Sequence, residues 1–540
     1  MRLLLLVVLF MVISGLLNLI LLYFLLNSGR TVDSPTPFQN LVAVASKNRT
    51  QDVEISAKGL QKTQVPVGII PVEVDHHHYS EDEEDEREND LNLTPRVALT
   101  PLYRMPKPVV MVMTYLRVEY LATTLDSLFS LPGIDKFAVI ISQDGFDRSV
   151  QEVSLQYSDK AELKQWERVP TFGVQQHSHA YLAQHYGRAL EYVFSHPSNY
   201  SHVIIVEDDM IFSPDFLSLF ERTAYLLEID ETLMCVSSWN DNGFNDLVDD
   251  HRRLFRTSYF PGLGWMMRRQ LWLELGPVWP HQHWDHFMRL DSTHKGRECI
   301  VPEISRNFNI GVHGAHIDPT TYQEKLARIR YSKIQADFGD LSYLLSSQYE
   351  TGMQQLVNSA IRISSVHGVV ELLAQTSGES TVLVAYEQSQ IDPLANALRI
   401  WNPLRALHQH TTILKVSGHV LILADRRMSP YLKGEEHIPQ PASLLAVEAQ
   451  AGDSCELACR QRELHCHAPS FQYINNCVNV TAHFACSRGC HMETGRDMPN
   501  LVVEKSSHNY DRCLISEEAP TCTARHPDTR RLCACIGNGR

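Results

Sequence analysis

Three short, wholly apolar runs, separated by stretches with helical spacing, most constrain what this chain can fold into. The runs are Val109–Met113 (VVMVM), Phe137–Ser142 (FAVIIS) and Val203–Val206. Between them, Leu121–Leu131 and Ala180–Phe194 repeat their apolar residues with the period of a helix. Strands without polar alternation are typical of a mostly parallel sheet that helices cover on both faces. The pattern predicts an α/β domain.

The third run ends on consecutive carboxylates, Glu207, Asp208 and Asp209. Ser213-Pro214 then predicts the next helix, with serine at the cap and proline at the first helical position. Ligands of such sheets bind at the carboxyl ends of the strands, where a cation would offset the repulsion between the acids. Consecutive oxygen ligands suit Mg²⁺ or Mn²⁺ bound together with substrate phosphates, which indicates glycosyl transfer from a nucleotide sugar. The alternative is an ordinary acidic surface loop.

The N-terminus predicts a membrane anchor. Leu3–Leu26 is 24 residues without a charge, which as a helix would be about 36 Å long and cross a bilayer core of about 30 Å. A cleaved signal peptide is the alternative, but its apolar core is about 7–15 residues long. We therefore expect a cytoplasmic tail at 1–2, a signal-anchor at 3–26 and, because of its prolines and the acidic run Glu81–Asp90, a disordered stem at 27–104.

The cysteines indicate an oxidising compartment. Ten of the 12 lie between Cys455 and Cys535, a density typical of disulfides. Zinc binding is the alternative, and spacing alone does not determine the connectivity. Glycosylation sequons occur at Asn48, Asn92, Asn199 and Asn479. Anchor, cysteines and sequons together predict a type II protein in a secretory lumen, and the net charge of −15 argues against a nucleic-acid partner.

Longer motifs carry a resemblance to the N-acetylglucosaminyltransferase I family, Golgi enzymes that act on N-glycans, and to its relative that extends O-mannose glycans. They are VIIVEDDMIFSPDF, YFPGLGWMMRRQLWLELGPVWPHQHWDHFMR, GRECIVPEISRNFNIG and DLSYL near 340, within a resemblance that covers roughly 106–430. The resemblance implies a GT-A glycosyltransferase fold, with a Rossmann-like catalytic domain at 105–335 and a smaller C-terminal subdomain at 336–449. Residues 450–540, here called the cysteine-rich module, resemble the cysteine-rich end of N-acetylglucosaminyltransferase V.

The resemblance also implies roles for individual residues. Asp209 corresponds to the direct metal ligand, for which Mn²⁺ is expected, and Glu207 and Asp208 contact the nucleotide or sugar beside it. The residues that match the uridine diphosphate site of the family are Arg117, Asp144 and His185. Asp285, in HWDHF, corresponds to the catalytic base.

Several positions depart from the family. One cysteine pair near the nucleotide is replaced by Tyr115 and Gly145, whereas the resemblance implies that Cys235–Cys299 is retained as a disulfide. His286 stands where the family usually has a second acid after the base. The donor loop reads GVHGAHIDPTTYQEKL, so that His313 and His316 lie where the phosphate contacts are expected; a structural role is the preferred interpretation for both.

The resemblance therefore predicts a Golgi single-pass type II enzyme that moves N-acetylglucosamine from UDP-GlcNAc, in β1,2 linkage, to the α1,3-arm mannose of high-mannose N-glycans. Transfer to O-linked mannose is the first alternative. A catalytically inactive lumenal glycan-binding protein is the second. Expected partners are UDP-GlcNAc, mannose-terminated glycoprotein glycans and, through the anchor, the membrane. A homo-oligomer or other Golgi enzymes remain open as further partners.

Overall fold

The computed structural model describes residues 105–170, 178–312, 318–363, 366–374, 378–516 and 518–537. All of them belong to one compact unit of the chain. The predicted tail, anchor and stem (1–104), the sequons at Asn48 and Asn92, and both loop histidines, His313 and His316, lie outside the described residues. Among the residues that are described, no helix combines the length and apolarity needed to cross a membrane.

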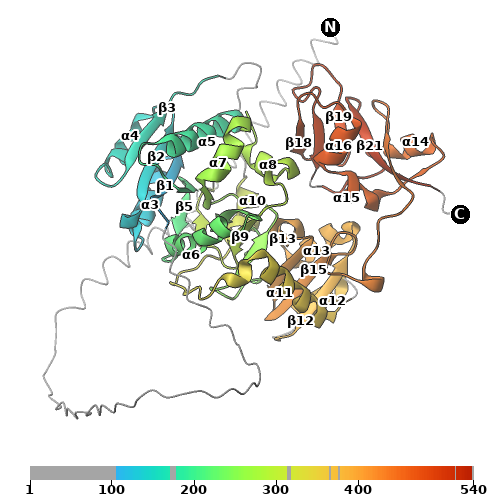
Figure 1. Ribbon diagram of the computed structural model, residues 1–540, viewed down its shortest axis with the longest axis horizontal. Coiled ribbons are helices and arrows are strands. Elements are labelled where there is room, and N and C mark those ends of the chain that lie inside the picture. Colours follow the sequence, from blue (N-terminus) through green and yellow to red (C-terminus); the bar gives the residue numbers. More distant parts are fainter. Residues whose placement is uncertain are drawn as a thin grey trace, which may run out of the picture. The chain divides into compact units, whose positions relative to one another are not determined.

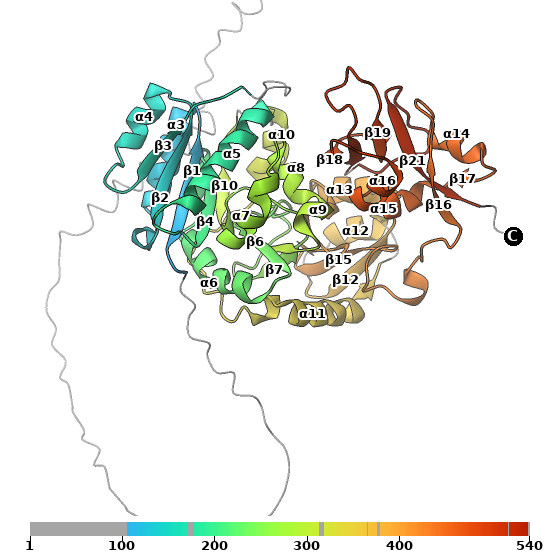
Figure 2. The ribbon, with the colours of Figure 1, turned by 45° about the horizontal axis from the view of Figure 1, so that its top comes forward.

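A sheet of eight strands forms the larger part of the fold (Figures 1 and 2). Its order is β3-β2-β1-β4-β8-β6-β9-β7. The first four strands are parallel, β8 is antiparallel to both of its neighbours, β6 and β9 are parallel, and β7 is antiparallel to β9. The strands are β1 Pro108–Thr114, β2 Ala138–Asp144, β3 Glu162–Trp166, β4 His202–Glu207, β6 Leu233–Ser237, β7 Leu254–Thr257, β8 Trp265–Arg268 and β9 Glu298–Pro302; a separate ribbon pairs β5 Met210–Phe212 with β10 Asn307–Asn309.

Helices cover both faces of this sheet, which explains why its strands are apolar throughout. Side chains of β1 alternate between two cores: Val110 and Val112 pack in one, Val109, Met111 and Met113 in the other. The first core is closed by α3 and α6 and the second by α5, α7 and α8. The helices of this part are α3 Val118–Phe129, α4 Arg148–Leu155, α5 Ser178–Ser195, α6 Phe216–Ile229, α7 Arg269–Leu275, α8 Trp284–Arg289, α9 Asp291–His294 and α10 Pro319–Glu324.

The predicted start of the helix after the acidic triplet is wrong by two residues. Helix α6 begins at Phe216, so Ser213 and Pro214 precede it. The Ser213 hydroxyl donates to the Ser332 carbonyl at 2.5 Å rather than capping the helix. Asp215, at the N-terminal flank, accepts instead from the buried Arg306 Nε at 2.9 Å. Tertiary hydrogen bonds, which the local pattern does not reveal, decide where this helix starts.

A smaller sheet follows, with the order β11-β12-β15-β14-β13. Its elements are β11 Ile361–Arg362, β12 Thr381–Tyr386, β13 Leu407–His408, β14 Thr411–Val416, β15 His419–Asp425, α11 Ser346–Ser359, α12 Val366–Leu373 and α13 Ile391–Leu398. A buried polar contact joins it to the larger sheet: His408 Nδ1 on β13 lies 2.7 Å from Glu298 Oε1 on β9. Within the larger sheet, Arg256 Nε on β7 lies 2.7 Å from the other oxygen of Glu298. Short 3₁₀ turns connect elements along the chain: η1 Ile134–Lys136, η2 Gly276–Val278, η3 Leu326–Arg328, η4 Ser342–Leu344, η5 Gln388–Gln390, η6 Pro403–Ala406, η7 Gly434–Glu436 and η8 Ala468–Ser470.

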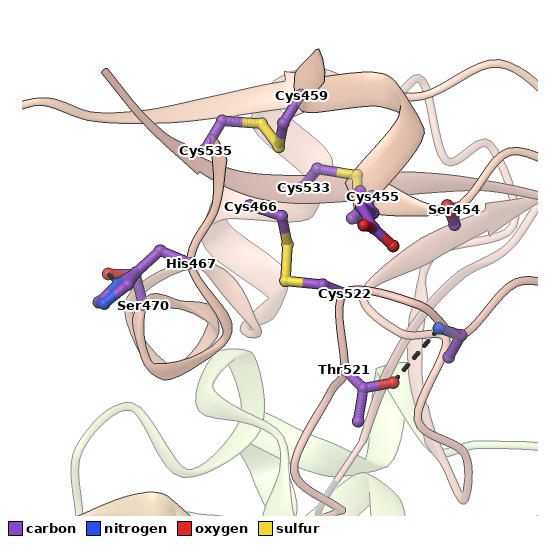
Figure 3. The surroundings of a disulfide bond; sticks show 12 residues. Ser454, Cys455, Cys459, Cys466, His467, Ser470, Thr521, Cys522, Cys533 and Cys535 are labelled. Carbon is purple, nitrogen blue, oxygen red and sulfur yellow. Dashed lines mark hydrogen bonds between the residues drawn. A yellow bond between two sulfur atoms is a disulfide. The ribbon is translucent and has the colours of Figure 1, made fainter. Parts of the chain in front are cut away.

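The cysteine-rich module has its own sheet and its own apolar core. Its elements are β16 Leu444–Glu448, α14 Cys455–Arg460, β17 His465–Cys466, α15 Phe471–Ile474, α16 Cys477–His483, β18 Cys490–Glu493, β19 Asn500–Val502, β20 Cys513–Ser516 and β21 Thr529–Ile536. Five disulfides hold it together: Cys455–Cys533, Cys459–Cys535, Cys466–Cys522, Cys477–Cys490 and Cys486–Cys513. Figure 3 shows the first three, of which two tie α14 to β21.

All cysteines of the chain are in disulfides, so the zinc alternative does not describe this module. The sixth bridge, Cys235–Cys299, joins the neighbouring strands β6 and β9, as the resemblance implied. The predicted fold class, a GT-A-type α/β sheet with a smaller second sheet and an added disulfide-rich region, is confirmed.

Candidate active site

The carboxyl ends of β1, β2 and β4 lie side by side and present the predicted polar residues at one edge of the sheet. In the parallel register, Met113 is opposite Glu207 and Thr114 is opposite Gln143. Asp144 ends β2, one residue beyond Gln143. The structure thus places Asp144 and Glu207 at the carboxyl ends of their strands, where the sequence predicted them; ligand binding at this edge stays a prediction.

The turn after β4 is held by helix α3. The Thr124 hydroxyl donates to the Asp208 carbonyl at 2.8 Å and accepts from the Met210 amide at 3.0 Å. On the opposite side, the Ile310 amide donates to the Asp209 carbonyl at 2.7 Å. These bonds fix the backbone of the acidic triplet, so its side chains occupy defined positions.

Arg117, the residue before α3, bridges the two aspartates. Its Nη1 lies 2.6 Å from Asp209 Oδ2, and its Nη2 donates to Asp208 Oδ1. Thr114 Oγ1 donates to the other Asp208 oxygen at 2.8 Å. Burial works against the charge on Arg117, but the carboxylates of Asp209, Asp208 and Glu207 outweigh it and raise the pKa of the guanidinium. Burial also raises the pKa of Asp208 to about 6, although Arg117 opposes this.

Glu207 is connected to the base-bearing helix through Tyr186. The Tyr186 hydroxyl on α5 donates to Glu207 Oε1 at 2.8 Å, and its ring stacks on Trp284 with centroids 4.0 Å apart. Burial, with the carboxylate of Asp209, raises the pKa of Glu207 to about 7, against the lowering effect of the Tyr186 hydrogen bond. Trp284 is the first residue of α8 and directly precedes Asp285.

Asp285 is partly accessible, with 37% of its side chain exposed. Its Oδ2 lies 3.0 Å from Arg289 Nη1 and 3.9 Å from His286 Nε2. Burial would raise its pKa, but Arg289 and His286 together lower it below the usual value. Asp285 is therefore ionised at neutral pH, the state required of a general base.

The acidic triplet and Asp285 both influence the Tyr186 phenol electrostatically. Burial raises the pKa of this phenol, and so do Glu207, Asp209 and Asp285. The residues expected at the metal and the residue expected as the base thus act on one common group.

The residues expected at the nucleotide occupy the neighbouring strand and helix. Asp144 Oδ2 lies 3.0 Å from Arg168 Nε, and burial raises the Asp144 pKa to about 6 although Arg168 lowers it. His185 on α5 hydrogen-bonds through Nε2 to the Ser142 hydroxyl at 2.9 Å. Burial lowers the pKa of His185 to about 3, so it is a neutral imidazole.

The two positions of the missing family disulfide adjoin in space. A Cβ placed on Gly145 would lie 3.8 Å from Tyr115 Cε2. Arg168 stacks over the Tyr115 ring at 4.2 Å and over the Tyr181 ring at 3.8 Å. This aromatic–guanidinium stack occupies the place where the family carries a bridge.

The carboxylate oxygens of the acidic triplet fit a divalent cation. Three clustered carboxylates share a single guanidinium, that of Arg117, which pairs with two of them. Gly311 leaves space beside Asp209 that a side chain would fill, since a Cβ on Gly311 would lie 2.2 Å from Asp209 Oδ2. Within the described ranges, no group of three or more His, Cys, Asp or Glu side chains encloses a metal position. The residues thus suit an ion that completes its coordination with phosphate oxygens and water.

Sequence reasoning missed the groups that support this site. They are Thr114, Thr124, Arg168, Tyr186, Trp284 and Gly311. Tyr186 and Trp284 directly adjoin the predicted His185 and Asp285, which was the available signal; the others come from positions with ordinary local patterns.

A groove of about 470 Å³, lined in part by Arg253, Tyr349 and Met353, shares no residue with the site.

Solved structures resemble this chain only weakly. One is the mannosyltransferase PcManGT from Pyrobaculum calidifontis in complex with GDP-Man and Mn²⁺, at 18% identity and a TM-score of 0.23, covering 32% of this chain and 47% of that one. Another is S. aureus TarS 1–349, at 13% identity and a TM-score of 0.28, covering 47% of this chain and 78% of that one. Likenesses at these TM-scores carry no argument about function.

A curated relative is more similar in sequence. It is the Arabidopsis thaliana protein named alpha-1,3-mannosyl-glycoprotein 2-beta-N-acetylglucosaminyltransferase, 39% identical over 269 residues. The match covers 48% of this chain and 60% of the relative's length. The model of the GNT-I family matches residues 44–416, which include every residue predicted for the site and end before the cysteine-rich module. The chain therefore belongs to the GNT-I family.

Proposed function

We propose that this protein is a metal-dependent, inverting glycosyltransferase that moves N-acetylglucosamine from UDP-GlcNAc to a terminal mannose in β1,2 linkage. The observation that carries the proposal is the arrangement around Tyr186. Its hydroxyl holds Glu207, its ring packs on Trp284 beside Asp285, and the Asp209 carboxylate lies close enough to act on its pKa. Family membership and the name of the Arabidopsis relative support the same reaction.

The donor would lie across the carboxyl edge of β1, β2 and β4. Asp144 and His185 would contact the uridine, and Glu207 the sugar. Arg117, which now pairs with Asp208 and Asp209, carries the positive charge needed beside a diphosphate. Bound at Asp209, Mn²⁺ would supply Lewis-acid stabilisation of the negative charge on the leaving diphosphate.

Asp285 would act as the general base. Its carboxylate accepts the proton of the mannose hydroxyl while that oxygen attacks the anomeric carbon. The bond from this carbon to the phosphate oxygen breaks, and UDP leaves with the electron pair. One displacement inverts the anomeric carbon, so no second nucleophilic carboxylate is needed. The lowered pKa of Asp285 keeps it ready to accept a proton.

We propose the α1,3-arm mannose of high-mannose N-glycans as the acceptor, in line with the relative's name. O-linked mannose is the alternative acceptor. We further propose a Golgi membrane location, with the charge-free segment 3–26 as a type II anchor and the folded residues in the lumen. The six disulfides support an oxidising compartment.

Calorimetry with UDP tests the donor site. The wild-type chain should bind UDP more tightly with Mn²⁺ than with chelator, and Asp209→Asn should abolish that difference while leaving the fold intact. A wild-type chain that binds UDP equally well without metal would contradict a metal role for Asp209. Failure to bind UDP under any condition would contradict the glycosyltransferase proposal itself.

A further inference from the structure

The helix that carries Asp285 is seated against the cysteine-rich module. Helix α8 contacts strand β18 (Figures 1 and 2). Helix α9 contacts α16. Trp284 and Met288 of α8 pack in the core beneath the large sheet, whereas Leu290, directly after it, packs in the core of the module. Phe287 touches both cores. The helix therefore lies between two apolar cores.

Alone, α8 has little to hold it in place. It spans six residues, its N-cap residue His283 has a positive φ of 51°, and no side chain caps it. Isolated helices this short are not stable in water, so packing must fix their position. The position of Asp285 relative to a bound donor consequently depends on what packs against α8.

One hydrogen bond joins the module to the residue after the base. His286 Nδ1 lies 3.2 Å from the carbonyl oxygen of Met492 on β18. A carbonyl oxygen only accepts, so Nδ1 carries the hydrogen and donates it. The other ring nitrogen, Nε2, is thereby turned toward Asp285, 3.9 Å from Oδ2. The hydrogen bond to the module thus determines which ring nitrogen of His286 points toward Asp285.

The accepting strand is itself firmly held. Cys490 begins β18 and is bridged to Cys477 on α16. Strand β18 pairs in parallel with β20, whose first residue, Cys513, is bridged to Cys486. One disulfide therefore anchors the strand that supplies the carbonyl and a second anchors its partner strand, which makes β18 a rigid support for α8.

We propose that His286 is a positioning residue through which the cysteine-rich module holds α8 and orients Asp285 toward the acceptor hydroxyl. The proposal rests on the proposed function, because it assigns Asp285 as the base of that reaction. It gives a role in catalysis to a module that lies beyond the residues matched by the family model. The module acts through His286, whose hydrogen bond goes to Met492 and whose Nε2 faces Asp285, so the direct effect falls on the base and not on the carboxylates of the donor site.

The test compares two substitutions in the full chain. His286→Leu removes the donor to Met492, whereas His286→Asn keeps an amide nitrogen near the place of Nδ1. Because small misplacements of a reacting group cost roughly tenfold to hundredfold in rate, His286→Leu should lower kcat of transfer by about that factor. Its KM for UDP-GlcNAc should stay unchanged, and His286→Asn should recover most of kcat. The matched control is His367→Leu, an exposed histidine beside Glu371 on α12, which should leave kcat unchanged.

Hydrogen exchange of the amides in residues 284–290 supplies a second measurement that does not depend on activity. Exchange there should be faster in His286→Leu than in wild type and close to wild type in His286→Asn. Wild-type kcat in His286→Leu, or no recovery in His286→Asn, would overturn the proposal. If the wild-type chain transfers no sugar, the proposed function fails. If His286→Leu leaves hydrogen exchange in residues 284–290 unchanged, the module does not hold α8 in place through His286.

Discussion

The hydroxyl of Tyr186 donates a 2.8 Å hydrogen bond to Glu207, and it does so from a ring that stacks on Trp284. Tyr186 thereby connects the end of β4 with the start of α8. Glu207 and Trp284, the two residues that it contacts, are 77 positions apart in the sequence. The hydrogen bond favours the charged form of the buried Glu207, and the stacked ring supports Trp284 beside the base. The donor side and the acceptor side of the site therefore share one side chain.

Removing the Tyr186 hydroxyl should weaken donor binding. In Tyr186→Phe the buried Glu207 loses its hydrogen bond, and bonds to charged groups contribute about 1.5–3 kcal/mol. We expect the Kd for UDP-GlcNAc to rise at least about tenfold, as calorimetry would measure. Tyr192→Phe is the matched control, because it removes a tyrosine–glutamate bond (to Glu162) from the exposed side of the same helix. Equal effects in both variants would contradict the role of Tyr186.

Substituting the base should separate binding from transfer. Asp285→Asn keeps the size of the side chain but cannot take a proton, and general-base catalysis contributes about 10²–10⁴-fold. Transfer should fall by that range, while UDP-GlcNAc binds as in wild type. Asp291→Asn, on the neighbouring helix α9 with 51% of its side chain exposed, serves as the control and should transfer normally. Substantial transfer by Asp285→Asn would remove Asp285 from the mechanism.

Arg117 should contribute to stability as well as to the site. Arg117→Met leaves the nearly buried Asp208 and Asp209 without their guanidinium partner. Because Arg117 is itself 32% exposed, the cost should lie below that of a fully buried pair, at about 1–3 kcal/mol of unfolding free energy. Urea denaturation without metal measures it. Arg148→Met breaks an exposed pair with Glu152 on α4 and should cost at most about 0.5 kcal/mol. Similar losses in both variants would contradict the assignment.

Burial of His202 should make stability fall in mild acid. Its side chain is fully buried at the start of β4, and burial, reinforced by Arg268 and opposed by Glu228, lowers its pKa to about 4. The unfolded histidine titrates near pH 6.5, so between about pH 6.5 and 4 only the unfolded chain binds the proton. The stabilisation is complete above this window and is lost as pH falls through it, by up to about 1.4 kcal/mol per unit.

Unfolding free energies of wild type and His202→Gln across pH 7.5 to 4.5 would check this prediction. The variant should show the smaller decrease with falling pH, because glutamine does not titrate. His185, which is buried with a pKa of about 3, contributes in the same direction in both proteins. Parallel curves for the two proteins would show that His202 does not cause the acid sensitivity.

The sequence pattern predicted the local elements better than their pairing. VVMVM became β1 because its side chains enter two cores, and helical spacing located α3 and α5 within a few residues. The insertion of antiparallel β8 between β4 and β6 depends on contacts between distant segments, which periodicity does not encode. The five bridges of the cysteine-rich module were likewise beyond prediction, because spacing leaves connectivity open.

The site was predictable in part. An apolar strand ending on Glu207 indicates a ligand edge on physical grounds alone, and the structure places Asp144 at the same edge, with β1 between the two strands. Asp285 has no such local signal and came from the family resemblance. Tyr186 and Arg168 act through tertiary contacts with Glu207 and Asp144, so only the folded chain reveals them.

Transfer of labelled N-acetylglucosamine tests the central claim most directly. The full chain would be incubated with Mn²⁺ and UDP-GlcNAc, with a high-mannose N-glycan in one reaction and an O-mannosyl peptide in another. We predict a β1,2-linked product on the α1,3-arm mannose of the N-glycan, lost in Asp209→Asn and on chelation. Product on the O-mannosyl peptide alone would support the proposed reaction but show that O-linked mannose, and not the N-glycan, is the acceptor. A folded, UDP-binding chain that modifies neither acceptor would contradict the account.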